Sequence, residues 1–158
     1  MRRRRLTARG VQPIGQVQHV CEWFSVYGAV APSTGERFFL ELPSLNAESF
    51  QRFVDAFAEA FPESLNLLLL DNSGAHMAHR LTLRANVRLV FLPPYGPELN
   101  PIERVWRDLK DALAWLQFPT LEGQQDHVAQ LLRAYQAATL QTLTGYTYLV
   151  EAIHALCP

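Results

Sequence analysis

The stretch that decides the fold runs Leu67-Leu68-Leu69-Leu70-Asp71-Asn72, then Val87-Arg88-Leu89-Val90-Phe91-Leu92, and then Pro93-Pro94-Tyr95-Gly96-Pro97-Glu98-Leu99-Asn100-Pro101-Ile102-Glu103. The first apolar run has no polar residue on either face, which predicts a strand buried on both sides of a sheet. Open α/β sheets place their sites at the carboxyl ends of strands. Asp71 is therefore predicted to lie at a site, and the strand at 87–92 is predicted to run parallel to the strand at 67–70.

A second acidic side chain, Glu103, is predicted to stand at a helix start. Asn100 is the expected N-cap, with Pro101 at the first helical position and Glu103 three residues after the cap. Two carboxylates at the ends of neighbouring elements can hold Mg²⁺, which prefers oxygen ligands. Each also has a purely structural interpretation, because Asp-Asn after a strand is commonly a turn or cap and Asn-Pro-Ile-Glu is a good capping box.

The two motifs taken together resemble the catalytic region of DDE-superfamily transposases, in the bacterial insertion-sequence branch related to mariner. The likeness rests on Asp71-Asn72-Ser73-Gly74-Ala75-His76, Pro93-Pro94-Tyr95 and Pro97-Glu98-Leu99-Asn100-Pro101-Ile102-Glu103-Arg104-Val105-Trp106. Gly28-Ala29-Val30, Thr34-Gly35 and Leu143-Thr144-Gly145-Tyr146 extend it over nearly the whole chain. Gly96 departs mildly from the family, which often has Ser at this turn.

The resemblance implies an α/β fold of the ribonuclease H-like type, a mixed sheet flanked by helices. It also implies an Asp-Asp-Glu catalytic set in which Asp71 and Glu103 are the second and third members and ligate metal. The family hydrolyses DNA at a transposon end and transfers the freed strand to target DNA, with two magnesium or manganese ions. Asn72 and His76 are possible auxiliary residues, although His76 is equally well explained as a capping or packing residue.

The first catalytic Asp has no counterpart in this sequence. Asp55 is the only aspartate before Asp71 and belongs to a predicted amphipathic helix, whereas Glu22 and Glu41 fall on the wrong strands. Glu98 is a weaker third candidate than Glu103 because it precedes the helix. The sheet is thus expected to lack its central first strand, and the chain alone is expected not to cut DNA.

Three functional hypotheses follow from this incomplete set. The first is a transposase fragment completed by an upstream segment, for example through frameshifting between two reading frames. The second is a catalytically inactive remnant that binds DNA or full-length transposase. The third and weakest is a host nuclease of the same fold. The exposed edges of an incomplete sheet favour a homo-oligomer or pairing with an upstream transposase segment.

Charge is sparse but placed where DNA contacts are expected. The net charge is −1, yet 13 of 14 basic residues are Arg, whose forked donors suit phosphate. The expected DNA contacts are Arg2, Arg3, Arg4 and Arg5 near the start of the chain, with Arg107 and Lys110 on the face of Glu103. The simpler interpretations are a solvated basic tail and an Arg107–Glu103 pair worth about 0.3–0.5 kcal/mol.

At 158 residues and 49% hydrophobic, the chain is long enough for one domain with a real core. The predicted parts are a basic arm or loop at 1–16, an incomplete catalytic core at 17–117 and a helical extension of the same domain at 118–158. The predicted elements are a hairpin of strands at 19–31 and 37–42, and helices at 46–61, 76–84, 121–137 and 148–156. Cys21 and Cys157 have no metal-site spacing, and no membrane span or signal peptide is visible, so a cytoplasmic location is expected.

Overall fold

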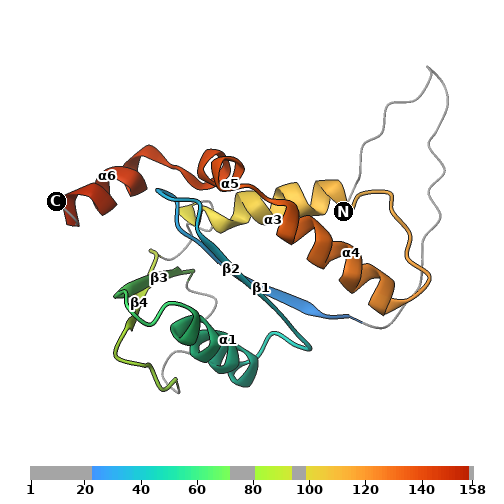
Figure 1. Ribbon diagram of the computed structural model, residues 1–158, viewed down its shortest axis with the longest axis horizontal. Helices are drawn as coiled ribbons and strands as arrows, with labels where there is room; N and C mark the ends of the chain where they lie inside the picture. Colours follow the sequence, from blue (N-terminus) through green and yellow to red (C-terminus); the bar gives the residue numbers. More distant parts are fainter. Residues whose placement is uncertain (1–22, 72–80, 94–98, 157–158) are drawn as a thin grey trace.

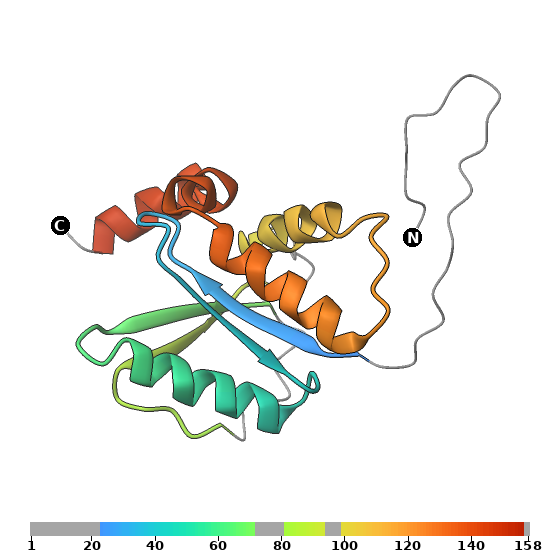
Figure 2. The same ribbon diagram turned by 45° about the vertical axis from the view of Figure 1, so that its right-hand side comes forward.

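The computed structural model describes residues 23–71, 81–93 and 99–156, and residue 156 through its backbone only. Its elements are β1 (Ser25–Val30), β2 (Arg37–Leu42), α1 (Ala47–Ala60), β3 (Asn66–Leu70), β4 (Val87–Phe91), α3 (Ile102–Ala112), α4 (Leu121–Ala134), α5 (Ala137–Thr144) and α6 (Thr147–Leu156). The β1–β2 hairpin lies between α1 on one side and α3 and α4 on the other (Figures 1 and 2). The predicted α/β class is confirmed.

The predicted hairpin is present, and its turn requires a glycine. β1 and β2 pair antiparallel from Ser25 opposite Leu42 to Val30 opposite Arg37. Gly35 closes the turn at φ +71°, a conformation that side chains disfavour. A Cβ on this residue would also lie 2.3 Å from the carbonyl oxygen of Ala137. Glycine is therefore required here by both backbone conformation and space.

The predicted parallel pair is also confirmed, with Asn66 opposite Val87 and Leu70 opposite Phe91. The prediction that β3 is buried on both faces is wrong, because Leu67 is 48% exposed. In the described residues, β3 pairs only with β4, and the β1–β2 and β3–β4 sheets are not hydrogen-bonded to each other. Helix α1 covers one face of this small sheet and leaves Leu67 outside the core.

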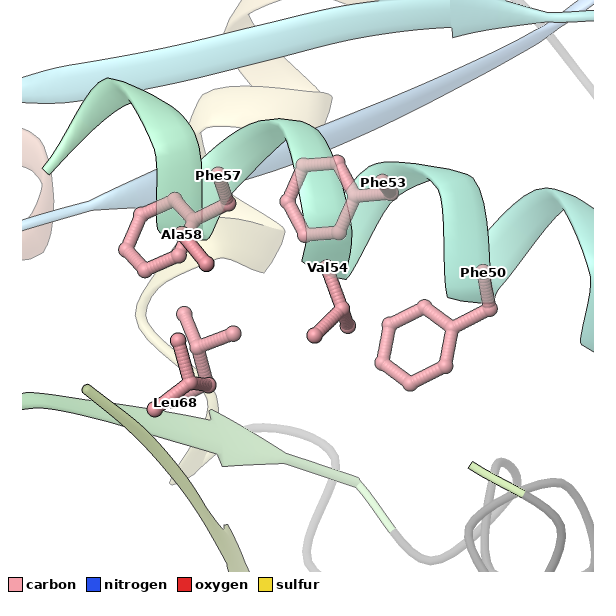
Figure 3. Close-up of a cluster of buried hydrophobic side chains, with 7 residues drawn as sticks. Phe50, Phe53, Val54, Phe57, Ala58 and Leu68 are labelled. Atoms are coloured by element: carbon pink, nitrogen blue, oxygen red, sulfur yellow. The ribbon is translucent and has the colours of Figure 1, made fainter. Parts of the chain in front are cut away.

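Helix α1 buries an aromatic stripe, as its apolar spacing predicts. Asn46 caps the helix, its Oδ1 accepting from the Ser49 amide at 2.8 Å. The buried residues of this core are Phe50, Phe53, Val54, Phe57, Ala58, Leu68 and Val87. Figure 3 shows Val54 and Ala58 on the side of α1 that faces Leu68 of β3. The helix therefore joins the two small sheets, since Phe38 and Leu40 of β2 also pack against this cluster.

The carboxyl end of α1 is capped from outside the helix. The Nδ2 of Asn86 donates to the carbonyl oxygens of Ala58 and Phe61, both at 2.9 Å. The Nδ2 of Asn66 donates to the Phe61 carbonyl as well, at 3.2 Å. These bonds satisfy carbonyls that a helix end leaves without partners, and they fix α1 to the starts of β3 and β4.

We expect Asn86→Ala to lower the free energy of unfolding by about 1–2 kcal/mol, because the Ala58 and Phe61 carbonyls each lose a hydrogen bond from the Asn86 side chain. Urea denaturation followed by far-UV circular dichroism measures this change. Glu63→Ala is the control, because Glu63 is exposed in the connection between α1 and β3, and it should change stability by less than about 0.5 kcal/mol. Equal stability of Asn86→Ala and wild type would remove the capping role of Asn86.

The carboxy-terminal helices differ from the prediction at one point. One helix was predicted over 121–137, but α4 ends at Ala134, and Tyr135 adopts an extended conformation with ψ 127°. A separate helix, α5, follows at Ala137–Thr144, and the predicted last helix is present as α6. The described helices include none that is long and apolar enough to cross a membrane.

Candidate metal-binding active site

Asp71 follows β3 directly, at the carboxyl end of the parallel pair. The amide of Leu92 donates to the carbonyl of Leu70 at 2.8 Å, so the ends of β3 and β4 lie side by side at this point. The Asp71 side chain is half-buried. This is the position that the sequence predicts, at the edge where parallel α/β sheets place ligands.

Glu103 lies in the first turn of α3 and its side chain is exposed. The prediction that Asn100 and Glu103 form a capping box for this helix is wrong. The helix starts at Ile102, and the side chain of Asn100 accepts only a long bond from the Ile102 amide, at 3.4 Å. The Glu103 amide instead donates to the backbone carbonyl of Asn100 at 3.1 Å. Glu103 is therefore placed by the backbone turn at Asn100–Pro101 and is left outward-facing.

Residues 93–101 connect β4, whose end adjoins Asp71, to the helix that carries Glu103. The described residues contain no group of three or more His, Cys, Asp or Glu side chains arranged to hold a metal. The remaining predicted site residues lie outside the described residues, and so does Glu22. They are Asn72, His76, Glu98, Arg2, Arg3, Arg4 and Arg5. The convergence of Asp71 and Glu103 on one cation stays a prediction.

The buried face of α3 fixes which residues point outward. Val105 is fully buried and Leu109 nearly so. Trp106 contacts Phe39 edge-on at 6.0 Å, and a Cβ at Gly28 would lie 2.7 Å from the Trp106 ring. Gly28 thus makes room on β1 for the indole ring, which packs against the cluster of Leu109, Val128 and Leu132.

The opposite face of α3 carries the charges. Glu103, Arg107 and Lys110 are exposed and fall at helical spacing on one face. The ion pairs among the described residues do not include Glu103 with Arg107. The simple pairing interpretation of Arg107 is therefore wrong, and α3 presents a carboxylate and two cations side by side.

Three tyrosines of the carboxy-terminal segment, in α6 and in the connections beside the helices, contact α3 and the segment just before it. The hydroxyl of Tyr148 donates to the backbone carbonyl of Leu99 at 2.6 Å, and the guanidinium of Arg104 lies 4.1 Å from the centre of the Tyr146 ring. The hydroxyl of Tyr135 donates to Asp108 Oδ2 at 2.7 Å. No site residue is predicted over residues 121–156, and Leu99 and Tyr148 are 49 positions apart in the sequence, so no local pattern reveals this contact.

Burial raises the pKa of Tyr148, Tyr146 adds to the shift and Arg104 opposes it. Burial also raises the pKa of Tyr135, and its hydrogen bond to the Asp108 carboxylate adds to the effect. A phenol with a raised pKa in the folded state stabilises the fold at pH values below its unfolded pKa of about 10. This contribution is lost as the pH rises through the raised folded value.

Tyr148→Phe is expected to reduce the free energy of unfolding at pH 7 by about 0.5–1.5 kcal/mol, because one hydrogen bond to a backbone carbonyl is lost. The difference from wild type should shrink at pH above about 10, since ionised Tyr148 can no longer donate. Urea titrations at pH 7 and at alkaline pH test both statements. A difference that stays constant across this range would mean that the Tyr148 hydroxyl is not the stabilising group.

Comparison with known proteins identifies the family. The family model described as DDE superfamily endonuclease matches residues 1–123. This chain belongs to the DDE superfamily of endonucleases. Enzymes of this superfamily use divalent metal ions. The predicted resemblance to the DDE superfamily is confirmed, and the matched segment contains both Asp71 and Glu103.

One sequence relative and one solved structure are similar to this superfamily member. An uncharacterized protein of Sinorhizobium fredii, y4pE/y4sA, is 32% identical over 114 residues, which are 72% of this chain and 83% of that protein. The Mos1 transposase, in a paired-end complex with left transposon end, superposes with a TM-score of 0.63 at 18% identity. The match covers 92% of this chain and 47% of the Mos1 chain, so this chain spans about half the length of that transposase. The likeness confirms the predicted ribonuclease H-like fold.

Proposed function

We propose that this chain forms part of a DNA transposase, in which Asp71 and Glu103 are two of the acidic ligands for the catalytic metal. The observation that carries the proposal is the placement of Asp71 at the joined ends of β3 and β4, from which the chain leads to Glu103 in the first turn of α3. The proposed reaction is hydrolysis of a phosphodiester bond at a transposon end, followed by transfer of the freed strand to target DNA.

The donor set of the site is suited to a hard cation. Mg²⁺ is usually held by one or two protein carboxylates together with waters and substrate phosphate, and Mn²⁺ accepts the same oxygen ligands. Asp71 is half-buried and Glu103 exposed, so both ligands remain accessible to a bound phosphate. The metal would stabilise developing charge on the phosphate and lower the pKa of the attacking water. Asn72 and His76 are proposed auxiliary residues of the same site.

The DNA is proposed to lie along the outward face of α3. Arg107 and Lys110 are exposed beside Glu103 on this helix, and they would contact phosphates on either side of the scissile bond. Arg2, Arg3, Arg4 and Arg5 are proposed to follow the backbone farther from the metal. The DNA partner is also supported by the likeness to a transposase that was captured with a transposon end.

A third acidic ligand is proposed to come from a segment other than residues 1–158. Asp55 is not suited to the role, because it accepts a hydrogen bond from Gln51 at 3.1 Å on the surface of α1 and lies 3.9 Å from Arg84. Glu41 lies on the α4 side of the hairpin, beside Asp126 and Arg133. We therefore propose that the chain alone does not cleave DNA and that a complete site holds two metal ions.

The alternative function is a catalytically inactive remnant that binds DNA or full-length transposase. The described residues contain no group of three or more metal-ligating side chains, and this observation supports the inactive remnant as well as it supports the incomplete transposase. In either case, residues 118–158 are proposed to belong to the catalytic domain, since α4 and α5 both contact α3.

The experiment that distinguishes these functions compares two polypeptides. One is the 158-residue chain, and the other joins to it the reading frame that precedes its gene. Each is incubated with Mg²⁺ or Mn²⁺ and plasmid DNA carrying the sequences that flank the gene. The proposed function predicts cleavage by the joined polypeptide only. Cleavage by neither polypeptide, with binding of the flanking DNA retained, would support the inactive remnant, and cleavage by the 158-residue chain alone would contradict the incomplete-site argument.

A further inference from the structure

The outer edge of β2 is the feature from which we infer an interaction. In the described residues, β2 pairs with β1 on one side and with no other strand. Phe38 and Leu40 pack against the α1 core, whereas Phe39 packs in the cluster of α3 and α4. Because side chains alternate along a strand, Arg37 and Glu41 share the α4 face with Phe39.

The turn of the hairpin determines which backbone groups face the outer edge. The amide of Ala31 donates to the carbonyl of Glu36, so this pair is hydrogen-bonded across the hairpin. In an antiparallel ladder, hydrogen-bonded pairs alternate with non-hydrogen-bonded pairs. Phe38 and Leu40 therefore bond to β1, and the amides and carbonyls of Arg37, Phe39 and Glu41 point to the outer edge.

A groove of about 770 Å³ runs between this edge and α4. Arg37 lies at one end, where its Nη2 donates to the backbone carbonyl of Arg133 at 3.2 Å. Glu41 lies toward the other end, and Asp126 also lines the groove. Burial raises the pKa of Glu41, while the nearby Arg133 opposes the shift and Asp126 adds to it. The groove thus has a carboxylate that a further cation would stabilise.

We propose that two copies of this chain associate through β2, in an antiparallel pairing centred on Phe39. In this register Arg37 of one copy lies opposite Glu41 of the second, Glu41 lies opposite Arg37, and Phe39 lies opposite its own symmetry mate. Each of these three residue pairs can exchange two backbone hydrogen bonds. The interface is isologous, as a two-fold dimer requires, and the two hairpins become one continuous four-stranded sheet. The dimer does not depend on the proposed catalytic role.

The register follows from charge and from the available donors. Centring the pair on residue 37 or on residue 41 would place like charges opposite each other. Centring it on Leu40 would place Arg37 opposite Pro43, which has no amide hydrogen to donate. Charged side chains on an edge strand often prevent association. Here the two charges have opposite sign and are spaced symmetrically about Phe39, so a second copy is attracted rather than repelled.

Sedimentation velocity of the 158-residue chain tests the dimer through charge exchange. We expect wild type to dimerise in the micromolar range. Glu41→Arg alone and Arg37→Glu alone should each raise the dissociation constant about tenfold or more, because like charges then meet at both symmetric positions. An equimolar mixture of the two variants should dimerise as wild type does, since every Arg in one copy then faces a Glu in the other. The double variant carrying both substitutions should also be restored.

The control is Glu63→Arg, an exposed site outside β2 with the same change in net charge, and it should leave the dissociation constant unchanged. Circular dichroism melting of each variant checks that the fold is retained. The proposal is overturned by a monomeric wild type at the highest concentration. It is overturned equally by a mixture that associates no better than its components, or by single variants that dimerise as wild type does.

Discussion

Glu103→Gln is expected to lower metal-dependent DNA cleavage by the complete transposase by more than about 100-fold. Replacing partners that only orient a metal ligand typically costs 10–100-fold, so loss of a direct ligand should cost more than about that range. Glutamine keeps the size of the side chain but removes its charge, so the substitution reports on ligation rather than on packing. Glu103 is exposed in the first turn of α3, and the fold should therefore tolerate this change.

The measurement is the rate of Mg²⁺-dependent cleavage of DNA containing the sequences that flank the gene. Glu122→Gln is the matched control, because Glu122 is also an exposed glutamate in the first turn of a helix, α4. It should leave the rate within about twofold of wild type. Asp71→Asn should resemble Glu103→Gln, and the double variant should be scarcely slower than either single variant, because ligands of one site act as a unit. Full activity of Glu103→Gln would remove this residue from the mechanism.

Phe53→Ala should destabilise the fold by about 3–5 kcal/mol, the usual cost of removing a buried aromatic ring. Phe53 is 3% exposed and lies at the centre of the α1 core. Its ring centroid lies 5.5 Å from Tyr27, 5.7 Å from Phe38, 6.1 Å from Phe50 and 6.2 Å from Phe57. The cavity left by alanine would therefore separate the hairpin from the helix that joins it to β3 and β4.

Urea denaturation of the 158-residue chain measures the effect, with Leu45→Ala as the control. Leu45 is 71% exposed just before α1, so its truncation should cost less than about 0.5 kcal/mol. A loss of less than about 1 kcal/mol for Phe53→Ala would mean that the aromatic stripe is not the main core of this fold.

Local chemistry explains the parts of the fold that could be predicted from the sequence. Turn residues at 32–35 and alternating apolar residues specify the hairpin, and helical spacing specifies α1 together with its Asn46 cap. The parallel pairing of β3 and β4 follows from the crossover between two strands. The exposure of Leu67 could not be predicted, because what covers a strand depends on residues distant in sequence. The break after Ala134 has no Gly or Pro beside it, so periodicity alone continues the helix to residue 137.

The candidate site was predictable to a different extent. The positions of Asp71 after a strand and Glu103 in the first helical turn follow from the sequence and are confirmed by the structure. The contacts that anchor α3 were not predictable, because Tyr148 and Tyr146 reach Leu99 and Arg104 across a long sequence separation. Helix periodicity separates the buried face of α3 from the face of Glu103, but it does not indicate which distant element holds the helix in place.

Asp71 and Glu103 are proposed to bind the same cation, and iron-mediated hydroxyl-radical cleavage tests this shared site. Fe²⁺ takes the place of Mg²⁺, and radicals generated at the bound ion cut the polypeptide backbone nearby. A shared cation predicts cuts near both residue 71 and residue 103. Excess Mg²⁺ should suppress these cuts, and Asp71→Asn should reduce them at both positions together. Cuts near only one of the two residues, or cuts near residue 103 that persist in Asp71→Asn, would contradict the shared site.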